Sequence, residues 1–193
     1  MRRFLLPLVL ALPMAAHSQM VAVYATVSPS HLSNVESGAV YTATGYTEQT
    51  ASYWSTGFGG GVTLSAVPVG PVRIGFDFRG STKPGSTGMQ SALFGVKVGI
   101  HLPALRVHPY VQASAGYLAA ETTNVSTPAG QTTGTIGGVF SNKYAAYEVM
   151  GGIDYPLVGP LDFRVVEVGV GHGALSSYDP TFVTINTGLV LHF

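Results

Sequence analysis

The stretch Val72-Arg73-Ile74-Gly75-Phe76-Asp77-Phe78-Arg79 alternates between apolar side chains and small or charged ones. A period of two residues predicts a β-strand, in which successive side chains point to opposite faces. One face of this strand is entirely apolar, and the other face carries all of its charges. The strand therefore needs an apolar environment on one side and a polar environment on the other.

The same period recurs along the chain and predicts eight strands. They are expected at residues 20–28, 53–65, 72–79, 90–102, 108–118, 144–155, 161–173 and 181–193. In the seventh stretch the apolar face shifts by one residue between Val165 and Val166. Because one extra residue in a strand restores such an alternation, we predict a one-residue β-bulge there.

The connections between these strands alternate in length. Three are short and rich in proline, at residues 68–71, 102–105 and 156–160. The other four are longer and polar, at residues 29–51, 80–88, 122–142 and 174–179. Short turns at one end and long loops at the other are typical of outer-membrane barrels, with the turns in the periplasm and the loops outside.

The composition also indicates a membrane environment. Only 9% of the residues are charged and 46% are apolar, whereas a soluble domain carries about 25% charged residues. The apolar face of each strand cannot lie in a lipid bilayer unless the strands close into a barrel, since lipid cannot satisfy an open edge. The chain has no cysteine, which excludes disulfides and thiolate chemistry. Its formal net charge of zero gives no indication of a nucleic-acid partner.

The first residues have the features of a secretory signal peptide. Arg2 and Arg3 precede a short apolar core, and small residues at Ala16 and Ser18 suit cleavage before Gln19. We therefore expect residues 1–18 to be removed and residues 19–193 to form an all-β, eight-stranded antiparallel transmembrane β-barrel. A soluble barrel is disfavoured because its apolar faces would point inward and its charges outward.

The charges support this orientation. All of those within the predicted strands fall on the face opposite the apolar one, so we expect them to face the lumen. Four basic and five acidic groups in one narrow interior should pair, because an unpaired buried charge is strongly unfavourable. The sequence thus predicts a lumen plugged by an ion-pair network of Arg73, Asp77, Arg79, Lys97, Glu148, Asp154, Asp162, Arg164 and Glu167.

The chain ends with Thr187-Gly188-Leu189-Val190-Leu191-His192-Phe193, in which apolar residues alternate up to a terminal aromatic residue. This ending and the eight-strand pattern resemble the small outer-membrane β-barrels that include the OmpA transmembrane domain and the OmpX-type proteins. The resemblance implies that Leu189, Leu191 and Phe193 form the signal read by the barrel-assembly machinery. It also implies a bacterial outer-membrane location among lipids and lipopolysaccharide.

Members of that group act as envelope anchors, as surfaces for adhesion or host interaction, and sometimes as lipid-modifying enzymes, and the fold does not choose among these roles. We expect a non-enzymatic structural or surface-interaction protein without cofactor or metal, whose loops 29–51 and 122–142 contact a host or envelope ligand. The alternative is an enzyme. His31-Leu32-Ser33-Asn34 resembles the His-x-Ser-Asn run of lipid A deacylases, which implies that His31 would activate a Ser33 nucleophile.

Overall fold

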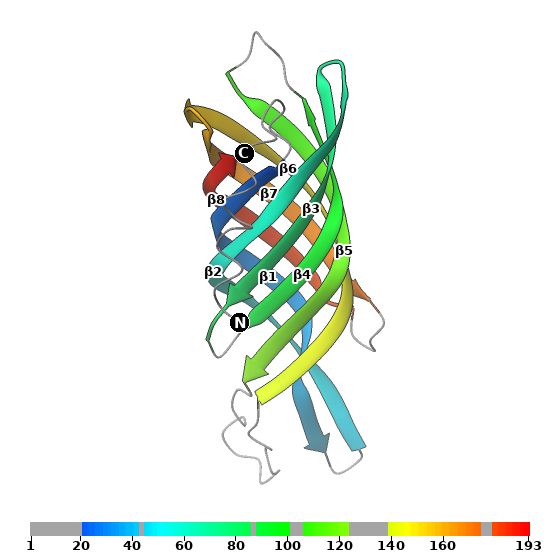
Figure 1. Ribbon diagram of the computed structural model, residues 1–193. Helices are drawn as coiled ribbons and strands as arrows, with labels where there is room; N and C mark the ends of the chain where they lie inside the picture. Colours follow the sequence, from blue (N-terminus) through cyan, green and yellow to red (C-terminus); the bar gives the residue numbers. More distant parts are fainter. Residues whose placement is uncertain (1–20, 43–44, 86–87, 101–105, 124–138, 175–178) are drawn as a thin grey trace, which may run out of the picture.

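A computed structural model describes residues 21–42, 45–85, 88–100, 106–123, 139–174 and 179–193 (Figure 1). Neighbouring strands are antiparallel and hydrogen-bonded throughout, and they form a closed barrel. The strands are β1 Val21–Thr42, β2 Gly45–Val69, β3 Val72–Lys83, β4 Met89–Ile100, β5 His108–Thr123, β6 Val139–Val158, β7 Leu161–Ala174 and β8 Thr181–His192. The described part of the chain contains no helix that is long and apolar enough to cross a membrane. The predicted eight-stranded antiparallel barrel is confirmed.

The end of the chain closes the barrel. β8 pairs with β1, from Ala22 opposite His192 to Ser33 opposite Thr181. One residue further on, the Phe193 N–H donates a hydrogen bond of 2.8 Å to the Val21 carbonyl oxygen. The sheet therefore has no open edge along this seam, as a strand protein in lipid requires.

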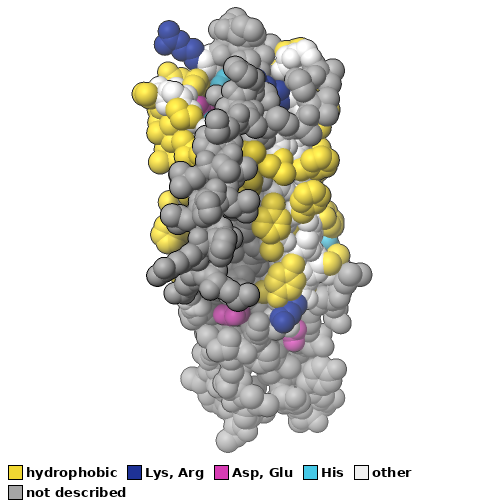
Figure 2. Space-filling view, viewed as in Figure 1, with side chains coloured by type: hydrophobic (Ala, Val, Ile, Leu, Met, Phe, Trp, Pro, Cys, Tyr) yellow, Lys and Arg dark blue, Asp and Glu magenta, His cyan; other side chains and the backbone are white. Residues whose placement is uncertain are grey.

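The two faces of the barrel wall differ as the sequence predicted. In β3, Phe76 and Phe78 point outward and are 45% and 58% exposed, whereas Asp77 and Arg79 point into the lumen and are 1% and 8% exposed. On the face shown in Figure 2, hydrophobic side chains gather on the visible middle part of the wall, and most of the visible charged side chains lie nearer its two ends. An apolar exterior around a charged interior is the arrangement of a transmembrane barrel, because lipid surrounds the outside.

The β-bulge in β7 is confirmed. Across to β6, Val166 pairs with Ile153 and Arg164 pairs with Asp154, so that Val165 has no opposite residue. As a result Val165 and Val166 both face outward, at 45% and 37% exposed. The bulge keeps apolar side chains on the lipid face before and after it.

The prediction of a loop at residues 29–51 is wrong. β1 continues to Thr42 and β2 begins at Gly45, and residues 35–42 pair with residues 45–51. Within the described residues these two stretches pair with no other strand. They form a two-stranded ribbon, the β1–β2 arm (residues 35–51), which projects from the lower end of the barrel in Figure 1. The sequence of the arm lacks the strict apolar alternation because no lipid face has to be matched there.

Other predicted loops are also shorter than expected. β3 extends to Lys83, β5 extends to Thr123, and β6 begins at Val139. The remainder of the loop predicted at 122–142, residues 124–138, lies outside the described residues, as does most of the loop at 174–179. Strand pairing thus continues past the stretches in which alternating hydrophobicity could be recognised.

The opposite end of the barrel, the turn end, holds the short connections and the first and last described residues. β2 and β3 are joined through Gly70-Pro71, and β6 and β7 through Gly159-Pro160. Gly70 and Gly159 have φ angles of +62° and +57°. This left-handed conformation favours glycine, because a side chain there would be strained. The short connection expected at 102–105 lies outside the described residues.

Candidate functional site

The lumen is crossed by a chain of ion pairs, the lumen network, whose centre is Glu167 on β7. Arg79 Nη1 lies 2.8 Å from Glu167 Oε1, and Arg164 Nη1 lies 3.1 Å from Glu167 Oε2. Asn186 Nδ2 also donates to Oε1 at 2.8 Å, and the Tyr110 hydroxyl donates to Oε2. The carboxylate is 1% exposed, so these donors replace the water that it loses on burial.

One branch of the lumen network ends at Asp77 on β3. Arg79 Nε donates to Asp77 Oδ2 at 3.0 Å. Three uncharged groups complete the coordination of this carboxylate: the hydroxyls of Tyr24 and Thr63 at 2.9 and 2.7 Å, and the amide of Gln112 at 2.8 Å. Asp77 is therefore held from β1, β2 and β5 as well as from its own strand, which ties the walls of the barrel together.

The other branch runs toward the turn end through Arg164, which is fully buried. Its guanidinium donates to both oxygens of Asp154, at 2.9 and 3.3 Å. Asp154 also lies 3.5 Å from Lys97 Nζ. Lys97 in turn lies 3.7 Å from the ring centroid of Tyr110. Cations stacked on aromatic faces in a dry interior gain further stabilisation.

Three residues of the predicted network have other surroundings. Glu148 makes no ion pair among the described residues and instead accepts a hydrogen bond from the Thr184 hydroxyl. Asp162 faces two histidines rather than an arginine or lysine: His192 Nε2 lies 3.0 Å and His108 Nδ1 3.5 Å from Asp162 Oδ2. Arg73 lines the turn end of the lumen but has no carboxylate within ion-pair distance in the part of the chain that the structure describes.

Two inward side chains have contacts that the sequence did not predict. Lys83, in the stretch 80–88 that was expected to be a loop, is 1% exposed and its ammonium group donates to Ser81 Oγ at 3.2 Å. His108, at the start of the predicted strand 108–118, contacts Asp162. The signal for both was the period of two: Lys83 continues the inward row of Asp77 and Arg79, and His108 continues the row of Tyr110.

The loop-side end of the lumen is closed by apolar side chains, which the sequence analysis did not predict. This cluster, the apolar cap, consists of Leu32, Val35, Met89, Leu93, Leu118, Ala120, Tyr144, Ala146 and Phe182. Leu32, Val35 and Leu118 are completely buried. The cap draws on β1, β4, β5, β6 and β8, so the base of the β1–β2 arm is packed into the mouth of the barrel.

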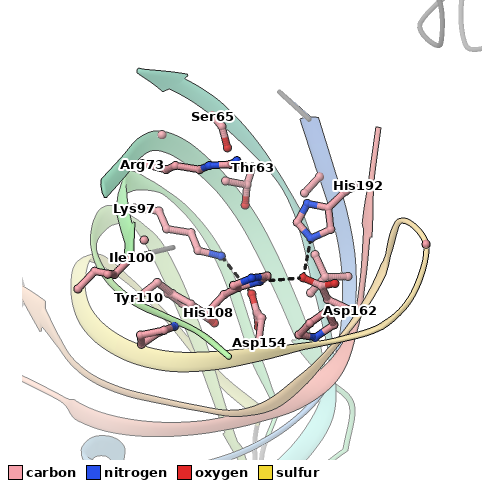
Figure 3. A pocket seen from close by; sticks show the side chains of 17 residues that line it. Thr63, Ser65, Arg73, Lys97, Ile100, His108, Tyr110, Asp154, Asp162 and His192 are labelled. Atoms are coloured by element: carbon pink, nitrogen blue, oxygen red, sulfur yellow. Dashed lines mark hydrogen bonds and ion pairs between the residues drawn. The ribbon is translucent and has the colours of Figure 1, made fainter. Parts of the chain in front are cut away.

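The turn end contains a cavity of about 230 Å³, the mouth cavity, which Figure 3 shows from close by. Its polar lining includes Arg73, Lys97, His108, Asp162 and His192. These side chains come from five different strands and point toward a common space (Figure 3). Packed side chains fill the rest of the lumen more tightly, and a second hollow beside Arg79 and Glu148 measures only about 30 Å³.

The His31-Leu32-Ser33-Asn34 run lies in β1 at the base of the arm. His31 Nδ1 and Ser33 Oγ are 3.4 Å apart on the outer side of the wall, and the His31 ring contacts the Trp54 ring at 5.0 Å between centroids. Leu32 between them points inward into the apolar cap. Asn34 adopts a φ of 59° at the irregularity where pairing with β2 shifts. Among the described residues no carboxylate contacts His31.

The C-terminal residues proposed as an assembly signal share the lipid face. Leu189, Leu191 and Phe193 are 49%, 38% and 47% exposed on the outside of β8. Residues 1–18, predicted to be a signal peptide, lie outside the described residues. Within the described ranges no group of three or more His, Asp or Glu side chains is arranged to hold a metal ion.

Several solved structures are similar to the chain. Neisserial surface protein A matches with a TM-score of 0.48 and 14% identity over 89% of this chain and 99% of that one. Ail, the attachment invasion locus protein of Yersinia pestis, matches with a TM-score of 0.44 and 10% identity over 89% and 99%. The N-terminal barrel of Pseudomonas aeruginosa OprF matches with a TM-score of 0.44 and 11% identity over 87% and 97%.

The chain has the architecture of a small outer-membrane β-barrel. This statement rests on its own closed sheet, apolar exterior and charged lumen. No protein-family model and no curated protein sequence matches the chain. What this outer-membrane-type barrel does must therefore be argued from its own surfaces.

Proposed function

We propose that this barrel is a non-enzymatic outer-membrane protein that presents the β1–β2 arm and the neighbouring loops as a contact surface for a host or envelope ligand. The observation that carries the proposal is the length of the two strands. β1 has 22 residues and β2 has 25, whereas about 9–11 residues cross a bilayer. The arm therefore extends beyond the lipid, where its backbone edges are available to a partner.

The filled lumen supports a surface role over a transport role. The lumen network occupies the middle of the barrel, and the apolar cap closes the loop-side end. A solute would have to displace paired charges and packed apolar side chains, both of which are costly to rearrange. A ligand that binds outside the barrel does not have to displace these side chains.

The apolar exterior and the sequence patterns near the two termini support an outer-membrane location. In our proposal the barrel lies in a bacterial outer membrane, in contact with lipids and lipopolysaccharide. Residues 1–18 direct export and are then removed, and the barrel-assembly machinery reads the strand that ends in Leu191 and Phe193. Pulse labelling of the full chain in a Gram-negative host tests export, because cleavage should shorten the exported form by those residues.

Shortening the arm tests its function. Val35 is paired with Ala51, so replacing residues 36–50 with Asn-Gly leaves a two-residue hairpin that suits adjoining strands. Cells producing this variant should attach more weakly to cultured animal cells or lose resistance to detergents, relative to cells producing the unchanged barrel. A second variant, with residues 124–138 replaced by a short Gly-Ser linker, tests the other predicted loop.

The control inserts Asn-Gly into the Gly159-Pro160 turn, at the opposite end of the barrel. It introduces the same Asn-Gly dipeptide without touching the arm, and it should leave attachment unchanged. If both loop variants reach the membrane in normal amounts and neither changes attachment or envelope resistance, the proposed surface role is wrong.

A second candidate function, lipid A deacylation, is favoured by one observation. His31 and Ser33 lie side by side on the outer surface of the wall, where a lipid acyl chain could reach them. The absence of a carboxylate beside His31 in the described residues weighs against it, since such a base is ordinarily oriented by a third group. Mass spectrometry of lipid A from cells with the protein, without it, and with Ser33→Ala separates the two. Our proposal predicts identical spectra, and acyl loss that depends on Ser33 would establish the enzyme.

A further inference from the structure

The mouth cavity brings together basic side chains from separate strands. Arg73 comes from β3, Lys97 from β4, His108 from β5 and His192 from β8 (Figure 3). The side chains of Lys97, His108 and His192 are 15%, 30% and 25% exposed. These three side chains are accessible from the cavity and partly shielded from bulk water, a setting in which charged hydrogen bonds are stronger than on an open surface. Arg73 is exposed, at the rim.

The two carboxylates that line this cavity are already engaged. Asp154 receives both arms of the Arg164 guanidinium, at 2.9 and 3.3 Å. Asp162 Oδ2 lies between His192 Nε2 and His108 Nδ1, at 3.0 and 3.5 Å. Neither carboxylate lies within ion-pair distance of Arg73, and both are held by other side chains.

Arg73 is therefore a cation without a carboxylate partner among the described residues, at the rim of a polar cavity. Elsewhere in the described lumen, Arg79 and Arg164 each contact two carboxylates. A guanidinium is always charged and presents its N–H donors in a planar fork that suits an oxyanion. Lys97, which lines the same cavity from the neighbouring strand and lies 3.5 Å from Asp154, is a second cationic donor there.

We propose that the mouth cavity binds a phosphate group, held by Arg73 and Lys97 with the Ser65 hydroxyl at its side. The donors approach from different strands, and a tetrahedral phosphate can accept hydrogen bonds from several directions at once. The cavity volume of about 230 Å³ equals the liquid volume of roughly seven or eight water molecules at about 30 Å³ each. This space admits inorganic phosphate or a small phosphate ester, as the free molecule or as a lipid headgroup.

Calorimetric titration with inorganic phosphate tests the site. The mature barrel is refolded in a maltoside detergent, which carries no phosphate, and ionic strength is held constant with sodium chloride. The unchanged protein should give a saturable heat of binding in the millimolar range or tighter. A parallel titration with glycerophosphoglycerol, a phosphodiester, identifies the source: equal affinity indicates a lipid headgroup, and preference for inorganic phosphate indicates a soluble ligand.

Three variants locate the binding. Arg73→Gln should weaken phosphate binding by at least about tenfold, since it removes a charged hydrogen-bond donor. Gly99→Leu should block the cavity without changing any charge, because a Cβ at Gly99 meets nothing closer than 3.9 Å and further atoms would extend into the space. Arg106→Gln is the matched control: it removes the same charge from an exposed residue near this end that does not line the cavity.

The folded state of each variant is checked by its mobility on a gel before and after boiling. The proposal is overturned if the unchanged barrel binds no phosphate, or if Arg106→Gln weakens binding as much as Arg73→Gln does. It is also overturned if folded Gly99→Leu binds phosphate as tightly as the unchanged protein. The site is independent of the β1–β2 arm, so these results do not depend on the surface role proposed above.

Discussion

Gly152 leaves the space that the Tyr110 ring occupies in the lumen. A Cβ on Gly152 would lie 2.5 Å from the Tyr110 hydroxyl and 2.6 Å from the ring carbon that bears it. Tyr110 cannot move away freely, because it donates to Glu167 and stacks against Lys97. We expect Gly152→Ala to lower the free energy of unfolding by about 1–3 kcal/mol, the usual cost of overpacking.

Urea unfolding of the barrel in lipid vesicles measures this cost, and the adjacent glycine supplies the control. Gly151 faces outward, and a Cβ there meets only the Tyr110 carbonyl oxygen, at 3.8 Å. Gly151→Ala should therefore leave the unfolding midpoint unchanged or raise it slightly. Equal midpoints for the two variants would show that the Tyr110 contact does not govern packing in the lumen.

Arg164 neutralises two buried carboxylates, so its loss should be among the most damaging single changes. Arg164→Met keeps a long side chain but leaves Asp154 and Glu167 each short of a partner. Removing one partner of a buried ion pair costs about 3–5 kcal/mol, and the same unfolding experiment should show a loss of that size. Arg106→Met, at an exposed position, should cost little; a comparable loss in both variants would contradict the account of the lumen network.

At this scale the sequence predicted which side chains face the lumen but not all of their partners. The period of two is sufficient to place Glu148 and Asp162 inside. Their contacts with Thr184 and His192 depend on how far each strand is shifted along its neighbour, and a single strand pattern does not contain that information. The apolar cap could have been found, since Phe182 continues the inward row of Thr184 and Asn186.

The β-bulge in β7 adjusts which side chains of the strand face lipid and which face the lumen. Val165 has no opposite residue on β6, so its deletion would remove the bulge and join Arg164 to Val166 in regular alternation. Arg164 would still face the lumen opposite Asp154, and Val166 would still face lipid opposite Ile153. We therefore expect the deletion variant to reach the folded, protease-resistant form.

Deletion of Val168 is the contrast, because it removes a residue from the regular part of the strand, where Val168 pairs with Gly151. The residues before it would then turn over, and Glu167 and Arg164 would face lipid, where an arginine costs about 2–4 kcal/mol at the midplane. This variant should not give the protease-resistant form. If the two deletions behave alike, the bulge does not determine which side chains face the lumen.

The sequence predicted that the eight strands exist, but it predicted the residues at which they begin and end less well. Alternation is visible in the sequence only where one face meets lipid and the other meets the lumen. Beyond that zone β1 continues to Thr42 and β2 begins at Gly45, although residues 29–51 have the polar, glycine-containing composition of a loop. Pairing of the two backbones sustains the ribbon there, and backbone hydrogen bonds leave no hydrophobic period to detect.

For the whole molecule, the filled lumen predicts that the barrel does not conduct. In planar lipid bilayers the refolded protein should give no stable conductance steps above the level of protein-free membranes. The physical reason is that an ion crossing the lumen would meet both the lumen network and the apolar cap, one after the other. Removing one of them would leave the other to block the ion. Reproducible steps of uniform size would contradict a plugged lumen and would favour a transport function.

The closed barrel could be predicted as a whole, since even strand number, inward charges and a terminal aromatic residue all point to it. The ligand could not be predicted from the sequence, because barrels of this architecture differ in their loops and local sites. The mouth cavity depends on Arg73, Lys97 and His192 meeting from distant positions in the chain, which becomes visible only once the strands are in register.

The central claim is that the chain forms a closed barrel whose outer wall faces lipid, and heat-modifiability tests it most directly. The mature chain is refolded in detergent and run on an SDS gel with and without boiling, and the unboiled sample is also treated with protease. The account predicts different mobility in the two lanes and a protease-resistant barrel before boiling. Identical mobility together with complete digestion of the unboiled form would contradict it.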